Sequence, residues 1–243
     1  GSGYLTPPTI TTGGAGSGAT PIAYIGSSGI IARGSVKAHL SDIYLRFNYR
    51  GLLMPMSRLN TTWVVEQLHV QGTESSALQY WGGGPGLQIE GLTGGIFIGT
   101  IAEATGTEGI KVVSKYVEHV TFQSSYYESN CLKERGSAVL LTGSTDAEIG
   151  SPRHVTFAED AFTFQPLYPL PTVNGYPSTL TSMVQYLYSF EYGLYCTIRK
   201  PGFKSENFYK DAIYSGNPVY STSNEFIAGG GGGYIHNYDL LSA

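Results

Sequence analysis

Short segments in which apolar and polar residues alternate recur along this chain. The tetrapeptide HVTF occurs at residues 119–122 and again at 154–157. An apolar–x–apolar core of the same kind occurs in five segments: Ile43-Tyr44-Leu45, Leu68-His69-Val70, Ile96-Phe97-Ile98, Val120-Thr121-Phe122 and Val155-Thr156-Phe157. Three of the four intervals between them are near 25 residues, and the fourth is 35, as an insertion around residues 143–153 would produce. A fixed period of this size indicates a repeat architecture.

The repeat assigns faces to these segments, because alternate residues of a strand point to the same side. We expect the first apolar residues to form a single interior file: Ile43, Leu68, Ile96, Val120 and Val155. The residues between the two apolar positions, Tyr44 and Phe97 among them, should then point outward.

A β-sandwich is the alternative, since it also contains short alternating strands. A sandwich needs turns every 8–12 residues and hairpin dipeptides, and the Asn174-Gly175 pair that qualifies lies outside the repeat. The period near 25 favours stacked coils of short strands. We therefore predict an all-β chain with very little helix, folded as a parallel β-helix, which is a solenoid.

Four sequence stretches carry a family resemblance. They are GSGATPI at residues 16–22 with LSDIYL at 40–45, HVTFQSSYYESN at 119–130, and GSAVLLTG at 136–143. Over residues 9–165 the chain resembles the pectate-lyase-like right-handed parallel β-helix superfamily, and within it phage tailspikes and related polysaccharide-processing proteins. The resemblance implies a right-handed solenoid, a polysaccharide ligand and a homotrimer, for which the outward Tyr44 and Phe97 offer an apolar face.

The domain organisation follows from the repeat and from proline. Residues 1–12 read as an extended lead-in and residues 13–165 as parallel β-helix coils. The segment 166–178 is rich in proline, which removes ladder donors, so a loop or boundary is expected there. Residues 179–243 read as further β coils or a small terminal β unit.

The composition of the chain narrows the classes of ligand and partner that we expect. Charged residues make up 13% of the chain and the net charge is −4, without a basic run, so nucleic-acid binding is disfavoured. No apolar run approaches 18 residues, so we expect no membrane insertion. The two cysteines, Cys131 and Cys196, lack metal-site spacing and read as free buried thiols; no metal and no cofactor are expected.

Carboxylates in turns after the repeat strands suggest glycoside hydrolysis, which needs two of them flanking the bond. Glu128 follows one HVTF segment, and Glu159 and Asp160 follow the other. Neighbouring coils of a β-helix lie about 4.8 Å apart, so carboxylates on them would fall within catalytic range. We predict Glu128, Glu159 and Asp160 as catalytic residues; solvated turn acids, or a Glu128 that bonds turn amides, are the alternative.

Sugar binding draws on aromatic rings and on polar partners for hydroxyls. Trp81, Tyr126, Asp146 and Glu148 are the predicted substrate-binding residues: Trp81 precedes a glycine-rich turn, and the two acids lie in the insertion. Since Tyr126 and Tyr127 alternate, one of them must point outward. For β-elimination the alternative site is His119 and His154 with Arg153, although two ordinary outward histidines explain the same pattern.

These observations predict a tailspike-like protein of a phage virion that binds and cleaves a bacterial surface polysaccharide, by hydrolysis rather than by β-elimination. A non-catalytic structural or adhesive β-helix of the virion is the alternative, and a secreted polysaccharide lyase is a third possibility.

Overall fold

The computed structural model describes residues 28–46, 48–72, 83–132, 136–144, 148–163, 168–169, 179–180, 184–199, 202–203, 213–215 and 225–227. Every regular element within these ranges is a β-strand, which confirms the all-β prediction. Within the same ranges, no helix has the length and apolar character needed to cross a membrane.

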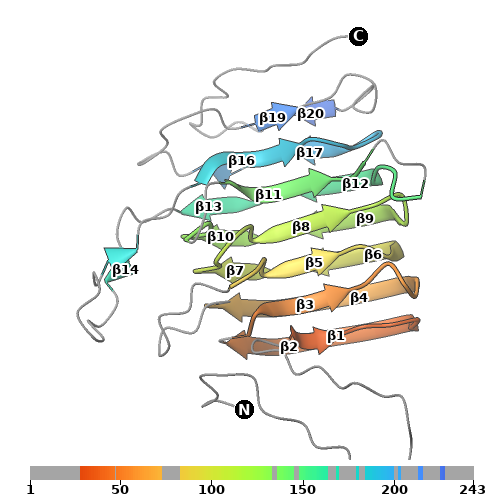
Figure 1. The fold of residues 1–243 in the computed structure, drawn as a ribbon, viewed down its shortest axis with the longest axis horizontal. Helices are drawn as coiled ribbons and strands as arrows, with labels where there is room; N and C mark the ends of the chain where they lie inside the picture. Colours follow the sequence, from red (N-terminus) through yellow and green to blue (C-terminus); the bar gives the residue numbers. More distant parts are fainter. Residues whose placement is uncertain are drawn as a thin grey trace, which may run out of the picture.

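Successive strands of the first sheet lie in successive coils and pair in parallel. They are β1 (Ser28–Ile31), β3 (Arg50–Met54), β5 (Leu87–Ile89), β8 (Ile110–Val113), β11 (Gly136–Thr142), β16 (Val184–Phe190) and β19 (Ile213–Ser215). Figure 1 shows these strands stacked in chain order from the N-terminal to the C-terminal end.

The second sheet is bent, so that each coil contributes two segments to it. The strands are β2 (Val36–Arg46), β4 (Asn60–Gln71), β6 (Leu92–Ile98), β7 (Ile101–Glu103), β9 (Val117–Gln123), β10 (Tyr126–Glu128), β12 (Arg153–Ala158), β13 (Ala161–Thr163), β17 (Thr197–Arg199), β18 (Gly202–Phe203) and β20 (Glu225–Ile227). The long β4 pairs with β6 through its first half and with β7 through its second half.

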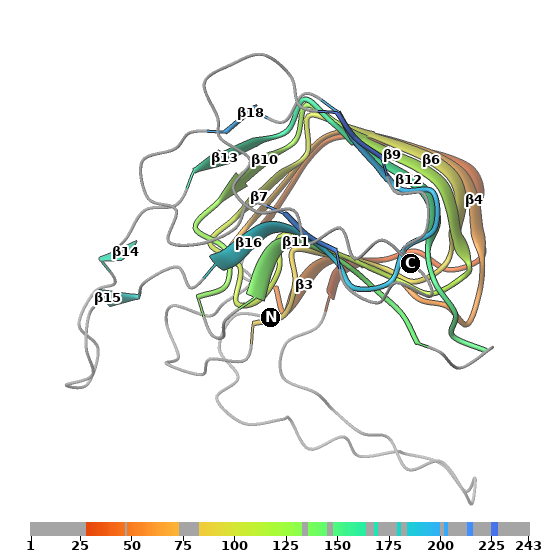
Figure 2. The ribbon, with the colours of Figure 1, turned by 90° about the horizontal axis from the view of Figure 1, so that it is seen from above.

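All pairings within these two sheets are parallel, and Figure 2 shows the coils superimposed when seen from above. Parallel neighbours in one sheet that are a full coil apart in sequence are typical of a solenoid. The prediction of a parallel β-helix is confirmed.

The coils turn at corners where residues other than glycine adopt the left-handed backbone conformation. One column of corner residues, at the bend of the second sheet, contains Asp42, Gln67, Ser124 and Glu159, with φ between 52° and 60°. A second column, one short strand earlier, contains Lys37, Thr62, His119, His154 and Tyr195, with φ between 51° and 57°. This conformation is uncommon outside glycine, and Asn, Asp and His adopt it more readily than other residues do.

Hydrogen bonds between coils continue through the corners. The backbone N–H of Ser124 donates to the carbonyl oxygen of Ala158 in the next coil at 2.8 Å, and that of Glu159 donates to Arg199 at 2.9 Å. The corners are therefore held by the same parallel ladder as the strands, which compensates for the unfavourable φ values.

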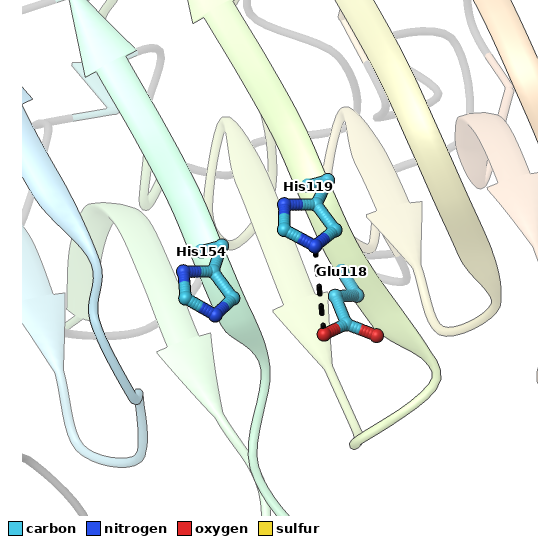
Figure 3. A group of neighbouring side chains, drawn as sticks. All are labelled: Glu118, His119 and His154. Atoms are coloured by element: carbon cyan, nitrogen blue, oxygen red, sulfur yellow. Dashed lines mark ion pairs between the residues drawn. The ribbon is translucent and has the colours of Figure 1, made fainter.

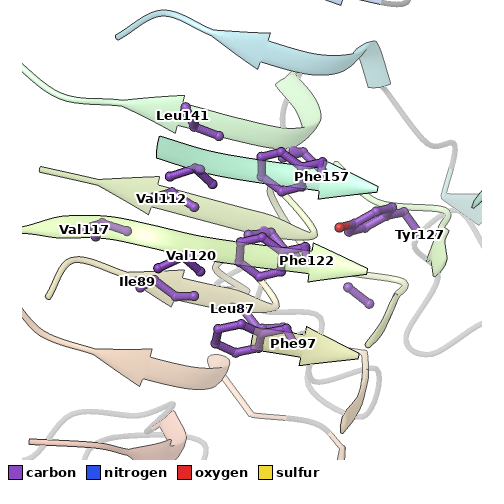
Figure 4. Close-up of a cluster of buried hydrophobic side chains, with 14 of the residues drawn as sticks. Leu87, Ile89, Phe97, Val112, Val117, Val120, Phe122, Tyr127, Leu141 and Phe157 are labelled. Atoms are coloured by element: carbon purple, nitrogen blue, oxygen red, sulfur yellow. The ribbon is translucent and has the colours of Figure 1, made fainter. Parts of the chain in front are cut away.

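The core consists of inward side chains stacked coil upon coil (Figure 4). The rings of Phe97, Phe122 and Phe157 follow one another at centroid distances of 4.7 and 4.9 Å, close to the spacing of neighbouring strands. All three rings are fully buried. Burial of one such side chain stabilises the fold by about 1.5–3 kcal/mol, and offset stacking adds to this.

The predicted interior file is correct only in part. Ile43 pairs with Leu68, and Val120 pairs with Val155, as the repeat requires. However, the first pair lies after the bend of the second sheet and the second pair lies before it, so they belong to two different columns.

The third segment is displaced by one residue. Gly95, rather than Ile96, pairs with Val120, and Phe97 is buried, so the prediction that Phe97 points outward is wrong. The run Ile96–Ile98 is apolar throughout and therefore carries no alternation that could indicate its faces. In the structure, the corner at Gly94, where φ is 71°, determines which residues of this run point inward. Tyr44 is 53% exposed, in agreement with its predicted outward position.

Strands after the proline-rich segment extend both sheets: β16 pairs with β11, and β17 pairs with β12. One strand of the segment 166–178, β14 (Tyr168–Pro169), forms an antiparallel pair with β15 (Thr179–Leu180), and the other residues of that segment lie outside the described residues. The lead-in 1–12 also lies outside them, and the predicted domain boundaries stay predictions. Cys131 and Cys196 are buried thiols that form no disulfide among the described residues, as predicted, and burial raises the pKa of the Cys196 thiol to about 12.

Candidate functional site: an outer face with paired carboxylates

Asp160 lies inside the coil. Its carboxyl group is fully buried, where Oδ1 accepts a hydrogen bond from the backbone N–H of Ser125 at 3.0 Å and Oδ2 accepts one from the Tyr188 hydroxyl at 3.0 Å. Tyr188 comes from β16, so this contact links the two sheets across the interior. A side chain in this position has no access to a polymer on the outer surface.

Burial also changes the protonation of Asp160. Desolvation of the charged form raises the pKa of its carboxyl group from 3.8 to about 8, and the hydrogen bonds from Ser125 and Tyr188 oppose that rise. Asp160 is therefore a mostly neutral group at pH 7. The hydroxyls of Ser125 and Tyr127 are also buried beside this carboxyl group, and they too favour its charged form.

Glu128 and Glu159 lie outside the coil, but the structure does not bring them together. Glu159 is an exposed corner residue whose Oε2 lies 3.5 Å from the Ser124 hydroxyl of the preceding coil. Glu128 ends β10, and its neighbour in the next coil is Thr163, four residues beyond Glu159. The three predicted catalytic acids do not share one face.

The predicted substrate-binding residues have different locations. Tyr126 points outward, and its hydroxyl donates a hydrogen bond to Oε2 of Glu128 at 3.0 Å, whereas Tyr127 is buried. Glu148 is exposed in the connection between β11 and β12. Trp81 and Asp146 lie outside the described residues.

The carboxylate that the structure places beside Glu128 is Glu103, at the end of β7. Glu103 and Glu128 are direct partners in the parallel pairing of β7 with β10. Neighbouring strands lie about 4.8 Å apart and residues in register point the same way, so the two carboxylates project side by side. Glu103 was missed because the repeat alignment included neither IAE (101–103) nor YYE (126–128), although the two tripeptides are one repeat interval apart.

Side chains of the preceding coil position Glu103. Gln71, its partner in β4, donates a hydrogen bond from Nε2 to Oε1 of Glu103 at 2.9 Å. Nε2 of His69 lies 3.2 Å from Oε2 of the same carboxylate. Tyr44 in turn packs against His69, with ring centroids 4.7 Å apart and the two rings tilted by 57°, and its hydroxyl donates to Gln71.

These residues form a continuous surface over three coils. We call it the outer carboxylate face and define it by His69, Gln71, Glu103, Tyr126 and Glu128. The Glu103 side chain is 15% exposed and that of His69 is 31% exposed, so both are partly shielded from water yet reachable from outside. Two carboxylates, an imidazole, an amide and a phenol provide acid–base groups and hydrogen-bond partners for sugar hydroxyls.

The histidines that the sequence suggested for β-elimination are neighbours at a different corner. His119 and His154 occupy equivalent positions in β9 and β12, and their rings stack in parallel with centroids 4.7 Å apart and an interplanar angle of 7°. Figure 3 shows the two rings side by side, with Glu118 beyond the edge of His119. Arg153, from the same segment as His154, is the register partner of Glu118.

Comparisons with known proteins give limited information. No protein-family model matches the chain, and no curated protein matches it. One solved structure to which it is similar is the catalytic domain of a GH87 alpha-1,3-glucanase in complex with nigerose, with a TM-score of 0.40 and 8% sequence identity. The match covers 80% of this chain and 40% of the solved chain, so this chain spans less than half of that protein's length. Similarity of this degree carries no information about activity.

Proposed function

We propose that this protein binds a polysaccharide along the outer carboxylate face and hydrolyses a glycosidic bond there. The observation that carries the proposal is the register of Glu103 with Glu128 on neighbouring coils. Retaining glycosidases hold their two carboxyl groups about 5–5.5 Å apart, and the strand spacing of about 4.8 Å lies close to that distance.

The surroundings of the two acids support different roles. Glu103 receives a hydrogen bond from Gln71 and lies against His69, and such contacts orient a carboxylate for attack on an anomeric carbon. Glu128 is held by the Tyr126 hydroxyl and takes the role of the acid that protonates the leaving oxygen. The predicted roles of Glu128 and Tyr126 are thereby kept, and Glu103 replaces Glu159 and Asp160 as the second acid.

The shape of the fold suits a polymer. Parallel coils repeat the same outward positions along the axis, so successive sugar units can meet successive coils. Tyr44, Tyr126 and His69 present ring faces and edges for the C–H surfaces of sugars, while Gln71 supplies an amide for hydroxyls.

The test is release of reducing ends from a panel of α-glucans, β-glucans, capsular polysaccharides and lipopolysaccharide O-chains. For a polymer that the protein cleaves, Glu103→Gln and Glu128→Gln should each reduce kcat by about 10²–10⁴-fold. Glu159→Gln is the matched control, because it removes an exposed acid of the neighbouring corner, and its activity should equal that of the unaltered chain. Equal activity in Glu103→Gln and Glu128→Gln would refute the proposed site.

The tailspike assignment is a further part of the proposal, together with its location on a virion and a homotrimeric assembly. It is supported by the sequence resemblance and by the exposed Tyr44 ring, but no longer by Phe97, which is buried. A mass measurement in solution that gives a stable monomer would contradict the trimer. Binding of a polymer without reducing-end release, lost in Glu128→Gln, would instead indicate the non-catalytic adhesive protein that is the alternative.

A further inference from the structure

The geometry points to a second site, away from the outer carboxylate face, in which Glu118, His119 and His154 bind one divalent transition-metal ion such as Zn²⁺. The ligand atoms of these three side chains all lie within 4.8 Å of one another. Two come from β9 and one from β12, so a bound ion would bridge two coils.

The corner conformation creates this arrangement. His119 and His154 both have left-handed φ values, of 54° and 51°, and they follow register partners, Glu118 and Arg153. Because the two backbones are superimposed, the two rings point the same way and lie parallel. Their Nε2 edges lie on the side of Glu118, whose Oε1 is 3.7 Å from Nε2 of His119 (Figure 3).

The distances suit a metal after a small movement. Zn²⁺ binds imidazole nitrogen at about 2.0–2.1 Å and carboxylate oxygen at about 2.0–2.2 Å, so ligand atoms around it lie closer together than 4.8 Å. All three side chains are at the surface, and the His119 side chain is 64% exposed. Rotation about their side-chain bonds can bring the three atoms together without disturbing the core.

The donor set selects the class of ion. Two imidazoles and one carboxylate suit Zn²⁺, Cu²⁺ and Ni²⁺, whereas Ca²⁺ and Mg²⁺ prefer oxygen ligands throughout.

Two further groups lie next to the site. Arg153 is the register partner of Glu118 and brings a positive charge to the same position of the neighbouring strand. The ring of Tyr195 stacks on His154 from the following coil at 5.1 Å and limits the movement of that imidazole on one side.

Titration of ZnCl₂ into the full chain, without an affinity tag and after treatment with a chelator, tests the site by calorimetry and by thermal melting. We expect one Zn²⁺ per chain and a rise in Tm, because the ion joins two coils. His119→Ala and His154→Ala should each weaken Zn²⁺ binding by at least about 10-fold and abolish the rise in Tm.

The matched control is His39→Ala. His39 also contacts a carboxylate, Glu66 at 2.8 Å, but its register partner in the next coil is Val64 rather than a second histidine. Zn²⁺ binding in His39→Ala should equal that of the unaltered chain. Absence of saturable binding, equal binding in His154→Ala, or an equal loss in His39→Ala would overturn the proposal. Ca²⁺ prefers oxygen ligands and should not bind the imidazoles. A rise in Tm of equal size with CaCl₂ would therefore also overturn the proposal.

Discussion

Asp160 and Glu128 lie at opposite ends of a pair of neighbouring strands, β13 and β10, and they differ completely in environment. Asp160 is buried among Ser125, Tyr127 and Tyr188, with its carboxyl pKa raised to about 8. Glu128 lies on the outer surface, where it accepts a hydrogen bond from Tyr126. The two acids have similar chemistry in the sequence, but one holds the interior together and the other is available to a ligand.

The difference follows from the direction in which each residue points. Asp160 comes just before β13 and is the register equivalent of Ser125, which is inward, whereas Glu128 lies two residues after the outward Tyr126. In a strand, a shift of one residue exchanges the inner and the outer face. The distinction between a structural and a candidate catalytic acid therefore depends on register alone.

The largest expected effect is the pH dependence of stability that the buried Asp160 produces. The pKa of Asp160 is higher in the folded chain, about 8, than the ordinary value of 3.8 that the unfolded chain should show. The unfolded state therefore releases this proton first, and the contribution of Asp160 to the free energy of unfolding falls by about 1 kcal/mol per pH unit as the pH rises from about 4 to about 8.

Asp160→Asn should remove this contribution. The variant and the unaltered chain are compared by urea denaturation at pH 5, 6, 7 and 8, because their difference cancels titration of all other groups. The difference in unfolding free energy should change steadily in favour of the asparagine variant as the pH rises. A difference that is independent of pH would show that Asp160 is not buried in the way described.

The second effect concerns the aromatic stack of the interior. Phe122→Ala leaves a cavity between Phe97 and Phe157 and should reduce the free energy of unfolding by about 3–5 kcal/mol, measured by chemical denaturation. Thr121→Ala, one residue away on the outer side, should change stability by less than about 1 kcal/mol. Similar losses in both variants would mean that the strand faces are assigned wrongly.

The smallest expected effect concerns Glu128 on the outer carboxylate face. Tyr126→Phe removes the hydroxyl that donates to Glu128 but keeps the ring, and a net hydrogen bond is worth about 0.5–1.5 kcal/mol. On a polymer that the protein cleaves, kcat should fall by about 2- to 10-fold, because the Glu128 carboxylate loses the contact that orients it. An unchanged kcat would show that Tyr126 does not position Glu128.

The fold could be predicted from sequence because the 25-residue period and the alternating segments are both local signals. The pairs of Ile43 with Leu68 and of Val120 with Val155 were correct for that reason. The outward position of Tyr44 followed from the same alternation.

The predictions that were wrong or missing concern residues for which the alternation of apolar and polar positions gives no information. Ile96, Phe97 and Ile98 form a continuous apolar run, so their faces depended on the corner at Gly94. The repeat alignment used one segment from each coil, so it did not show that left-handed corners at Gln67, Ser124 and Glu159 divide the second sheet into two segments per coil. Glu103 was overlooked because its short strand, β7, lies after such a corner.

The most direct test of the central claim is to locate a bound oligosaccharide by hydrogen exchange. With an oligosaccharide from a polymer that the protein cleaves or binds, we expect increased protection of the backbone amides in 69–71, 101–103 and 126–128. Protection confined to 117–123 and 153–158, with no change in those three segments, would contradict that claim.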